Sequence, residues 1–200
     1  MSGEQSNWAN PMPAGLTALT VAVFIFYAMF TGKVDMGLSY GIAGIWLIGG
    51  FFVQIVVGII ELKLGSITGG NTFTWFGAYF MLVTGSVWLF EYFAHLNGWA
   101  FDTHIAGWSW LAMAIVLWLQ WPAFAKSMPL TVFLLICCMN LSLPFIVGLN
   151  LGLLAPATYA PIAGTLAGLA GLFGAYSAAA AVNNTAFGRQ ILPFPGPIVK

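Results

Sequence analysis

The sequence predicts an all-α integral membrane protein with six transmembrane helices. Of its 200 residues, 60% are hydrophobic and only 5% are charged, and the mean hydropathy is +0.94. Six segments are long enough to cross a hydrocarbon core of about 30 Å as helices. Their apolar runs are continuous and do not alternate as barrel strands do, so helices must satisfy the backbone groups in lipid. The predicted spans are residues 15–31, 39–62, 73–95, 106–121, 129–151 and 158–182.

The charged residues orient these spans. Six spans place both termini on one side, which carries Lys63, Lys126, Arg189 and Lys200, whereas Lys33 stands alone on the other side. Because cytoplasmic loops are enriched in Lys and Arg, both termini are predicted to be cytoplasmic. The formal net charge is zero, which argues against a nucleic-acid partner.

No polar stretch is long enough to form a soluble domain, so we expect a single transmembrane domain over residues 1–200. Short tails flank it at residues 1–9 and 189–200. The N-terminal tail has no Lys or Arg and no small-residue cleavage signature. The first span is therefore expected to be retained and not removed as a signal peptide.

A helix-start signal precedes the first span. Asn10 is a preferred N-cap residue, and Pro11 and Pro13 suit a first helical turn. The pattern fits a simple capped helix. If it is buried in the bundle, it also fits a site for a small anion at the positive end of the helix dipole.

The other spans differ in their side chains. Small residues in the second and last spans predict close helix packing, within the protomer or between subunits, and in the second span they could also widen a path. The fourth span has tryptophans near both ends and is predicted to be peripheral and lipid-facing. Adjacent cysteines in the fifth span are expected to pack as small hydrophobes. The small residues are Gly41, Gly44, Gly49, Gly50 and Gly58 in the second span and Gly164, Gly168 and Gly171 in the last. The tryptophans are Trp108, Trp110, Trp118 and Trp121, and the cysteines are Cys137 and Cys138.

Uncharged polar side chains inside the spans are candidate ligands for a small solute. Hydroxyls such as those of Thr17 and Thr74 usually bond back to their own helix. Gln54 and Asn140 are different, because an amide in the middle of a span needs a partner and usually faces the bundle interior. No Lys or Arg lies in the middle of a span. A permeant anion would therefore be held by hydrogen bonds and dipoles alone, which suits passage more than storage.

The acidic residues near the span ends allow more than one interpretation. Glu61 is expected to pair with Lys63 or to reach water, and proton coupling is the alternative. Four further side chains could meet as metal ligands, which makes a membrane-embedded metalloenzyme the rival hypothesis. These four are Glu91, His95, Asp102 and His104.

Five motifs in order along nearly the whole chain give it a family resemblance. Asn10-Pro11-x-Pro13-x-Gly15-Leu16 resembles the signature of the acetate uptake transporter family. The further matches are Gln54 with Gly58-x-x-Glu61-x-Lys63-x-Gly65; Phe73-x-x-Phe76-Gly77; Ala175-Tyr176; and Phe187-Gly188-Arg189-x-x-Leu192-Pro193.

The resemblance implies a hexamer of six-helix protomers in the plasma membrane of a prokaryote, each with its own path for acetate and related short-chain carboxylates. Transport would be channel-like or proton-coupled, with no enzymatic activity, cofactor or metal. A sensor that binds a small molecule without transporting it is a further alternative. The polar side chains and the helix start described above would then bind the substrate, at Asn10, Pro11, Thr17, Gln54, Thr74 and Asn140. Carried over by position from the family, an apolar constriction would be formed by Leu19, Phe76 and Ile136. Family members usually have Phe and Tyr at the first two constriction positions, so a change in size selectivity is expected.

Overall fold

The computed structural model describes residues 8–200, so residues 1–7 of the predicted N-terminal tail lie outside the described part. The described chain contains helices and no strand. The helices are α1 (Met12–Phe30), α2 (Met36–Lys63), α3 (Ile67–Trp75), the π-helical segment η1 (Phe76–Val83), α4 (Thr84–Asn97), α5 (His104–Ser127), α6 (Leu130–Asn150) and α7 (Pro156–Ala186).

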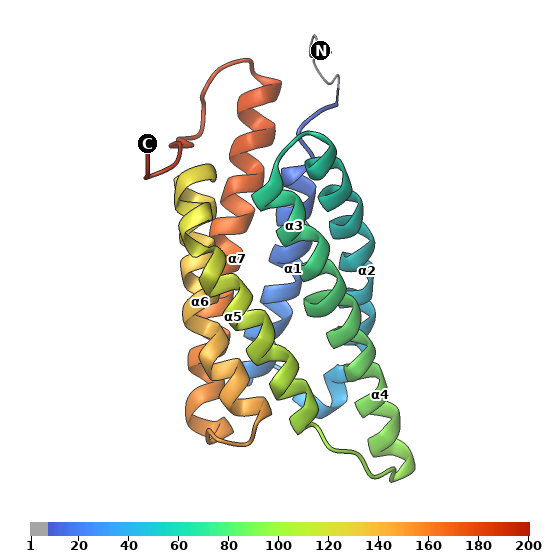
Figure 1. The fold of residues 1–200 in the computed structure, drawn as a ribbon. Coiled ribbons are helices and arrows are strands. Elements are labelled where there is room, and N and C mark those ends of the chain that lie inside the picture. Colours follow the sequence, from blue (N-terminus) through green and yellow to red (C-terminus); the bar gives the residue numbers. More distant parts are fainter. Residues whose placement is uncertain (1–7) are drawn as a thin grey trace.

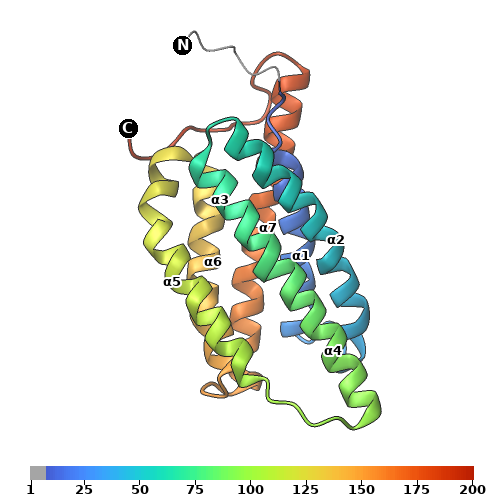
Figure 2. The same ribbon diagram turned by 45° about the vertical axis from the view of Figure 1, so that its right-hand side comes forward.

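These helices form six segments long and apolar enough to cross a membrane, because α3, η1 and α4 join into one span, Ile67–Asn97. This confirms the predicted all-α class and the number of spans. The spans run side by side along one axis, with the start of α1 and the C-terminal segment at the same end (Figures 1 and 2). We call that end the inner end. The opposite end, where the α4–α5 connection lies, is the outer end.

The third span begins at Ile67, earlier than the predicted residue 73. The predicted spans left residues 63–72, which are rich in glycine, between two helices. In the structure these glycines let α3 approach α2 closely: a Cβ on Gly70 would lie 2.8 Å from the backbone nitrogen of Leu62. A Cβ on Gly58 would likewise lie 2.9 Å from the backbone nitrogen of Thr74. Tertiary packing against α2 therefore extends this helix.

The small residues of the last span pack within the protomer. A Cβ on Gly164 would lie 2.8 Å from Cβ of Phe30, and one on Gly168 would lie 3.0 Å from Cδ2 of Tyr27. Gly171 is equally close to the ring of Phe24. This row therefore lets α7 contact α1 within the protomer, the first of the two packing alternatives.

The fourth span, α5, is not only a lipid-facing helix as predicted. It carries exposed apolar residues such as Trp108, but Trp110 is buried, and its ring centroid lies 6.0 Å from that of Phe26. Trp118 donates a hydrogen bond from Nε1 to the carbonyl oxygen of Asn140, at 3.2 Å. One face of α5 therefore forms part of the interior.

Candidate functional site

Two cavities lie toward opposite ends of the bundle. The inner cavity has a volume of about 40 Å³ and is lined by residues of α1, α2, α3, α5 and α6, including Leu16, Leu19 and Ile136. The outer cavity has a volume of about 1140 Å³ and is lined mainly by α4 and α5, with further residues from α1, α2, α3, η1, α6 and α7. Its lining is rich in aromatic rings, among them Phe26 and Trp110.

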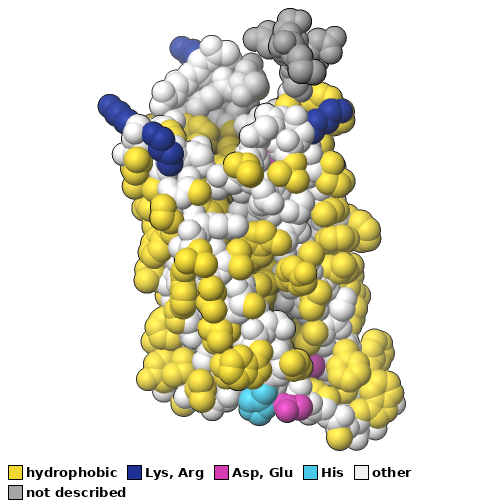
Figure 3. Space-filling model, in the orientation of Figure 1, with side chains coloured by type: hydrophobic (Ala, Val, Ile, Leu, Met, Phe, Trp, Pro, Cys, Tyr) yellow, Lys and Arg dark blue, Asp and Glu magenta, His cyan; other side chains and the backbone are white. Residues whose placement is uncertain are grey.

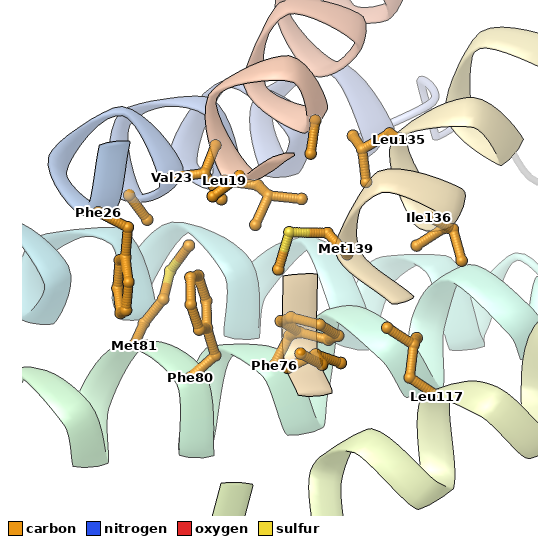
Figure 4. Close-up of a cluster of buried hydrophobic side chains, with 14 of the residues drawn as sticks. Leu19, Val23, Phe26, Phe76, Phe80, Met81, Leu117, Leu135, Ile136 and Met139 are labelled. Atoms are coloured by element: carbon orange, nitrogen blue, oxygen red, sulfur yellow. The ribbon is translucent and has the colours of Figure 1, made fainter. Parts of the chain in front are cut away.

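Buried apolar side chains separate the two cavities. Figure 4 shows Leu19 of α1, Met139 of α6 and Phe76 at the start of η1 pointing toward one another. All three are almost fully buried, at 7%, 1% and 5% exposure. We call these three residues the gate, after the role proposed for them below.

Two of the three predicted constriction residues are therefore brought together. The third, Ile136, is also buried and shares the inner cavity with Leu19. In Figure 4, however, it lies to one side of the gate, above Leu117. In this view the side chain of Met139 lies nearer to those of Leu19 and Phe76 than the side chain of Ile136 does. The two residues are three positions apart on α6, and the rotation of that helix decides which one faces α1.

The π-helical segment η1 shapes the gate. A π-helix adds a residue to the turn, is rare, and often occurs at functional sites. Here it places Phe76, Phe80 and Met81 on the buried side. The ring of Phe80 then stacks with that of Phe26 at 5.3 Å and contacts that of Phe76 edge to face at 5.4 Å. A continuous row of rings therefore leads from the gate to the outer cavity.

The two amides predicted to face the interior are buried and incompletely hydrogen-bonded. Gln54 is fully buried and donates from Nε2 to the carbonyl oxygen of Gly15 at 3.3 Å, while its Oε1 has no partner. Asn140 is 3% exposed, and neither Oδ1 nor Nδ2 has a partner. It lies one residue beyond Met139 on α6. An unsatisfied buried amide group costs about 1–3 kcal/mol, so these two side chains are candidates for contact with a solute.

The predicted helix start is present with one shift. The helix begins at Met12 with Pro11 as the N-cap residue, and Asn10 precedes it and accepts a hydrogen bond on Oδ1 from the Met12 N–H at 2.9 Å. Asn10 is exposed and Pro11 is half-buried. This segment therefore lies at the mouth of the inner end and not within the bundle.

The two predicted threonines lie away from both cavities. Thr17 is exposed and donates to the carbonyl oxygen of Pro13 at 2.9 Å. Thr74 donates to the carbonyl oxygens of Gly70 and Asn71, and its methyl group packs beside Gly58 of α2. Both hydroxyls bond back to their own helices, as hydroxyls in apolar helices usually do.

Glu61 does not form the predicted pair with Lys63. It is 7% exposed and lines the inner cavity. The Nζ of Lys63 instead lies 4.5 Å from the ring centroid of Trp8. The inner cavity thus contains a buried carboxyl group, which sequence analysis placed at the membrane surface.

The proposed metal cluster is not assembled. Within residues 8–200, no group of three or more His, Cys, Asp or Glu side chains is placed to hold a metal ion. His104 pairs with Asp102, and the ring of His95 lies 5.3 Å from that of Phe101. Hydrogen bonds from the backbone N–H and the ring of His104 hold the pKa of Asp102 below its usual value. The geometry of the described residues therefore gives the metalloenzyme hypothesis no support.

No protein-family model matches this chain, and no curated protein matches it. Among solved structures, the chain is similar to the bacterial acetate channel SatP, with a TM-score of 0.79 and 22% sequence identity. The match covers 94% of this chain and 99% of that chain. The protein therefore has the fold of that membrane channel over almost its whole length.

Proposed function

We propose that this protein transports acetate and related short-chain carboxylates across the prokaryotic plasma membrane, through a path within each protomer. The observation that carries the proposal is the gate of Leu19, Phe76 and Met139 between two cavities, in a chain with the fold of an acetate channel. Such a gate excludes water, so a carboxylate crosses it only after losing part of its hydration shell.

The buried amides supply the compensating contacts. Asn140 lies next to the gate and has two N–H donors without partners. A passing carboxylate would accept hydrogen bonds from these N–H groups, which would offset part of the free-energy cost of its dehydration. Among the buried polar residues of the described part of the chain none is cationic, so the carboxylate would be held weakly and could leave again. This supports channel-like passage over tight binding.

The inner end is proposed to face the cytoplasm. Lys63, Lys126, Arg189 and Lys200 belong to that end, and Lys or Arg side chains (dark blue) are visible there in Figure 3. This distribution follows the positive-inside rule. Asn10 and Pro11, at the inner mouth, would then meet the carboxylate on the cytoplasmic side. We also infer a symmetric oligomer, a hexamer by the family resemblance.

Flux measurement in proteoliposomes tests the function. Purified protein should take up radiolabelled acetate faster than empty liposomes, and a pH gradient would separate channel-like from proton-coupled transport. Native mass spectrometry of the same preparation gives the number of protomers. Binding of acetate without any flux would instead identify a sensor and contradict the proposal.

A matched pair of variants tests the gate. Met139→Ala should change the ratio of lactate to acetate uptake more than Ile136→Ala, because Met139 points into the gate and Ile136 only lines the inner cavity. Rates are normalised to the amount of folded protein. A larger effect of Ile136→Ala would return the constriction to the position predicted from sequence.

A further inference from the structure

We propose that the C-terminal segment, residues 187–200, positions one wall of the inner cavity, because it ties the turn between α5 and α6 to the end of α7. We call this segment the strap. Figures 1 and 2 show it leaving the inner end of α7 and running across to that of α5 and α6. The contacts of the strap stand on the geometry alone, and its effect on solute selection rests on the proposed function.

Two side chains of α7 hold the near part of the strap. Oδ1 of Asn184 accepts hydrogen bonds from the N–H groups of Ile191 at 2.8 Å and Leu192 at 2.9 Å. Its Nδ2 donates to the carbonyl oxygen of Leu192 at 2.8 Å. Two turns earlier on α7, the hydroxyl of Tyr176 donates to the carbonyl oxygen of Pro193 at 2.7 Å. The strap is therefore fixed to α7 by side chains that bond to its backbone.

The far part of the strap satisfies two backbone groups that the α5–α6 turn leaves open. Pro129 has no N–H, so the carbonyl oxygen of Ala125 lacks the donor that a helix supplies four residues on. The N–H of Val199 donates to this oxygen at 3.1 Å. Leu130 is the first residue of α6, so its N–H has no partner within that helix. The carbonyl oxygen of Pro195 accepts from it at 3.0 Å.

The same turn carries part of the wall of the inner cavity. Phe124, in the last turn of α5, and Met128, which ends that helix, are 2% and 8% exposed and line the cavity. Leu19 of the gate lines it as well. The cavity measures only about 40 Å³, and packed interiors have little spare room. A small shift of the turn would therefore change the space open to a solute.

A direct contact between α6 and α7 does not replace the strap. Ser177 of α7 donates from its hydroxyl to Oγ1 of Thr131 at 2.7 Å, which fixes the start of α6. That bond does not reach α5. The bond from Val199 to Ala125 does, so the strap holds the end of α5 that carries Phe124. Asn184 is thus a positioning residue for the inner cavity.

A matched pair of neighbouring asparagines tests this proposal in the full chain in nanodiscs. Asn184→Leu removes the contacts of this side chain with the strap at similar side-chain size. Asn183→Leu is the control, because Asn183 is also half-buried at the end of α7 but donates to Ala179 of its own helix, at 2.8 Å. Hydrogen–deuterium exchange reports on the α5–α6 turn, and proteoliposome uptake, normalised to folded protein, reports on solute selection.

In Asn184→Leu we expect the peptide that contains Leu130 to exchange about tenfold faster, the size of effect that loss of one or two hydrogen bonds gives. The ratio of lactate to acetate uptake should rise about threefold. Asn183→Leu should change neither. Asn184→Asp keeps the oxygen that accepts from Ile191 and Leu192, so it should restore most of the wild-type ratio.

If Asn184→Leu does not yield folded protein, Tyr176→Phe removes one bond to the strap and keeps the ring, and both readouts should move in the same direction. Unchanged exchange at the turn in a folded Asn184→Leu variant would overturn the proposal. An unchanged uptake ratio despite faster exchange would overturn it too, and so would equal effects of Asn183→Leu. Faster exchange in Asn184→Leu alone, in a protein that transports no acetate, would confirm the strap and refute the proposed function.

Discussion

The inner and outer halves of the bundle differ in cavity size and in wall chemistry. The inner cavity is about 40 Å³ and is lined largely by aliphatic side chains, whereas the outer cavity is about 1140 Å³ and is lined by rings. Each contains one buried carboxyl group, Glu61 inside and Glu91 outside. The basic residues, however, belong mainly to the inner end.

Under the proposed function, this difference assigns size selection to one half. A wide cavity discriminates little by size, so size selection would fall to the gate and the small inner cavity. The predictions below test this division, from the largest expected effect to the smallest.

Gly168→Leu should disrupt the packing of α7 against α1, on which both halves of the bundle depend. A Cβ at this position already meets the ring of Tyr27 at 3.0 Å, so a leucine would force α7 away from α1. Overpacking of this kind costs about 1–3 kcal/mol, and more where the backbone is in contact. We expect a large loss of folded protein, measured by thermal unfolding in detergent. A stable monomer with only the oligomer lost would show that this row meets a neighbouring subunit.

Phe76→Ala should widen the gate and so test whether size selection lies between the two halves of the bundle. Loss of the ring should raise lactate and succinate uptake relative to acetate by about tenfold, equivalent to about 1.4 kcal/mol of barrier. Truncation of a buried Phe also costs about 3–5 kcal/mol of stability, so uptake is normalised to folded protein. Unchanged uptake ratios in both Phe76→Ala and Leu19→Ala would place size selection elsewhere.

Asn140→Leu should stabilise the protein and slow transport. The unpartnered amide atoms cost about 1–3 kcal/mol in the folded state, and leucine of similar size avoids that cost. The same change removes the donors offered to a passing carboxylate. Asn97→Leu is the control, since Asn97 is exposed and already donates to the carbonyl oxygen of Phe93. Faster acetate flux in Asn140→Leu would contradict a role in the path.

His95→Ala combined with His104→Ala should change acetate uptake by less than about twofold, because neither lies near the gate and a pore needs no proton transfer from them. Proteoliposome uptake measures this. Complete loss of uptake with normal expression, or a stoichiometric metal in elemental analysis, would restore the metalloenzyme hypothesis.

Loss of the contacts between Asp102 and His104 should have the smallest effect on stability and transport. These contacts lower the pKa of Asp102, so they contribute stability above the unfolded pKa of about 3.9. That contribution is lost only as the pH falls through the still lower folded value, and transport between pH 5 and 8, roughly the range of stable folding, should not depend on it. His104→Ala should raise the Asp102 pKa in a carbon-13 titration. A pKa that stays at the wild-type value would mean that the backbone N–H alone lowers it.

The sequence by itself determined the class and the spans. Length and continuous apolarity decide whether a helix can cross a bilayer, and both are properties of a segment alone. The start of α1 was also predictable, since the Asn10 and Pro11 signal acts within a few residues. The family resemblance singled out Leu19 and Phe76, which the structure buries in one apolar cluster.

Only the tertiary structure decided which side chains face the interior. A helix that is apolar all round carries no signal for its rotation, so Met139 and Ile136 could not be told apart, and Trp110 was assigned to lipid although it is buried. The π-helical turn at Phe76–Val83 likewise has no sequence mark. The unpartnered amide atoms of Gln54 and Asn140 depend on what neighbouring helices place beside them, because a hydrogen bond across the bundle requires two segments to meet.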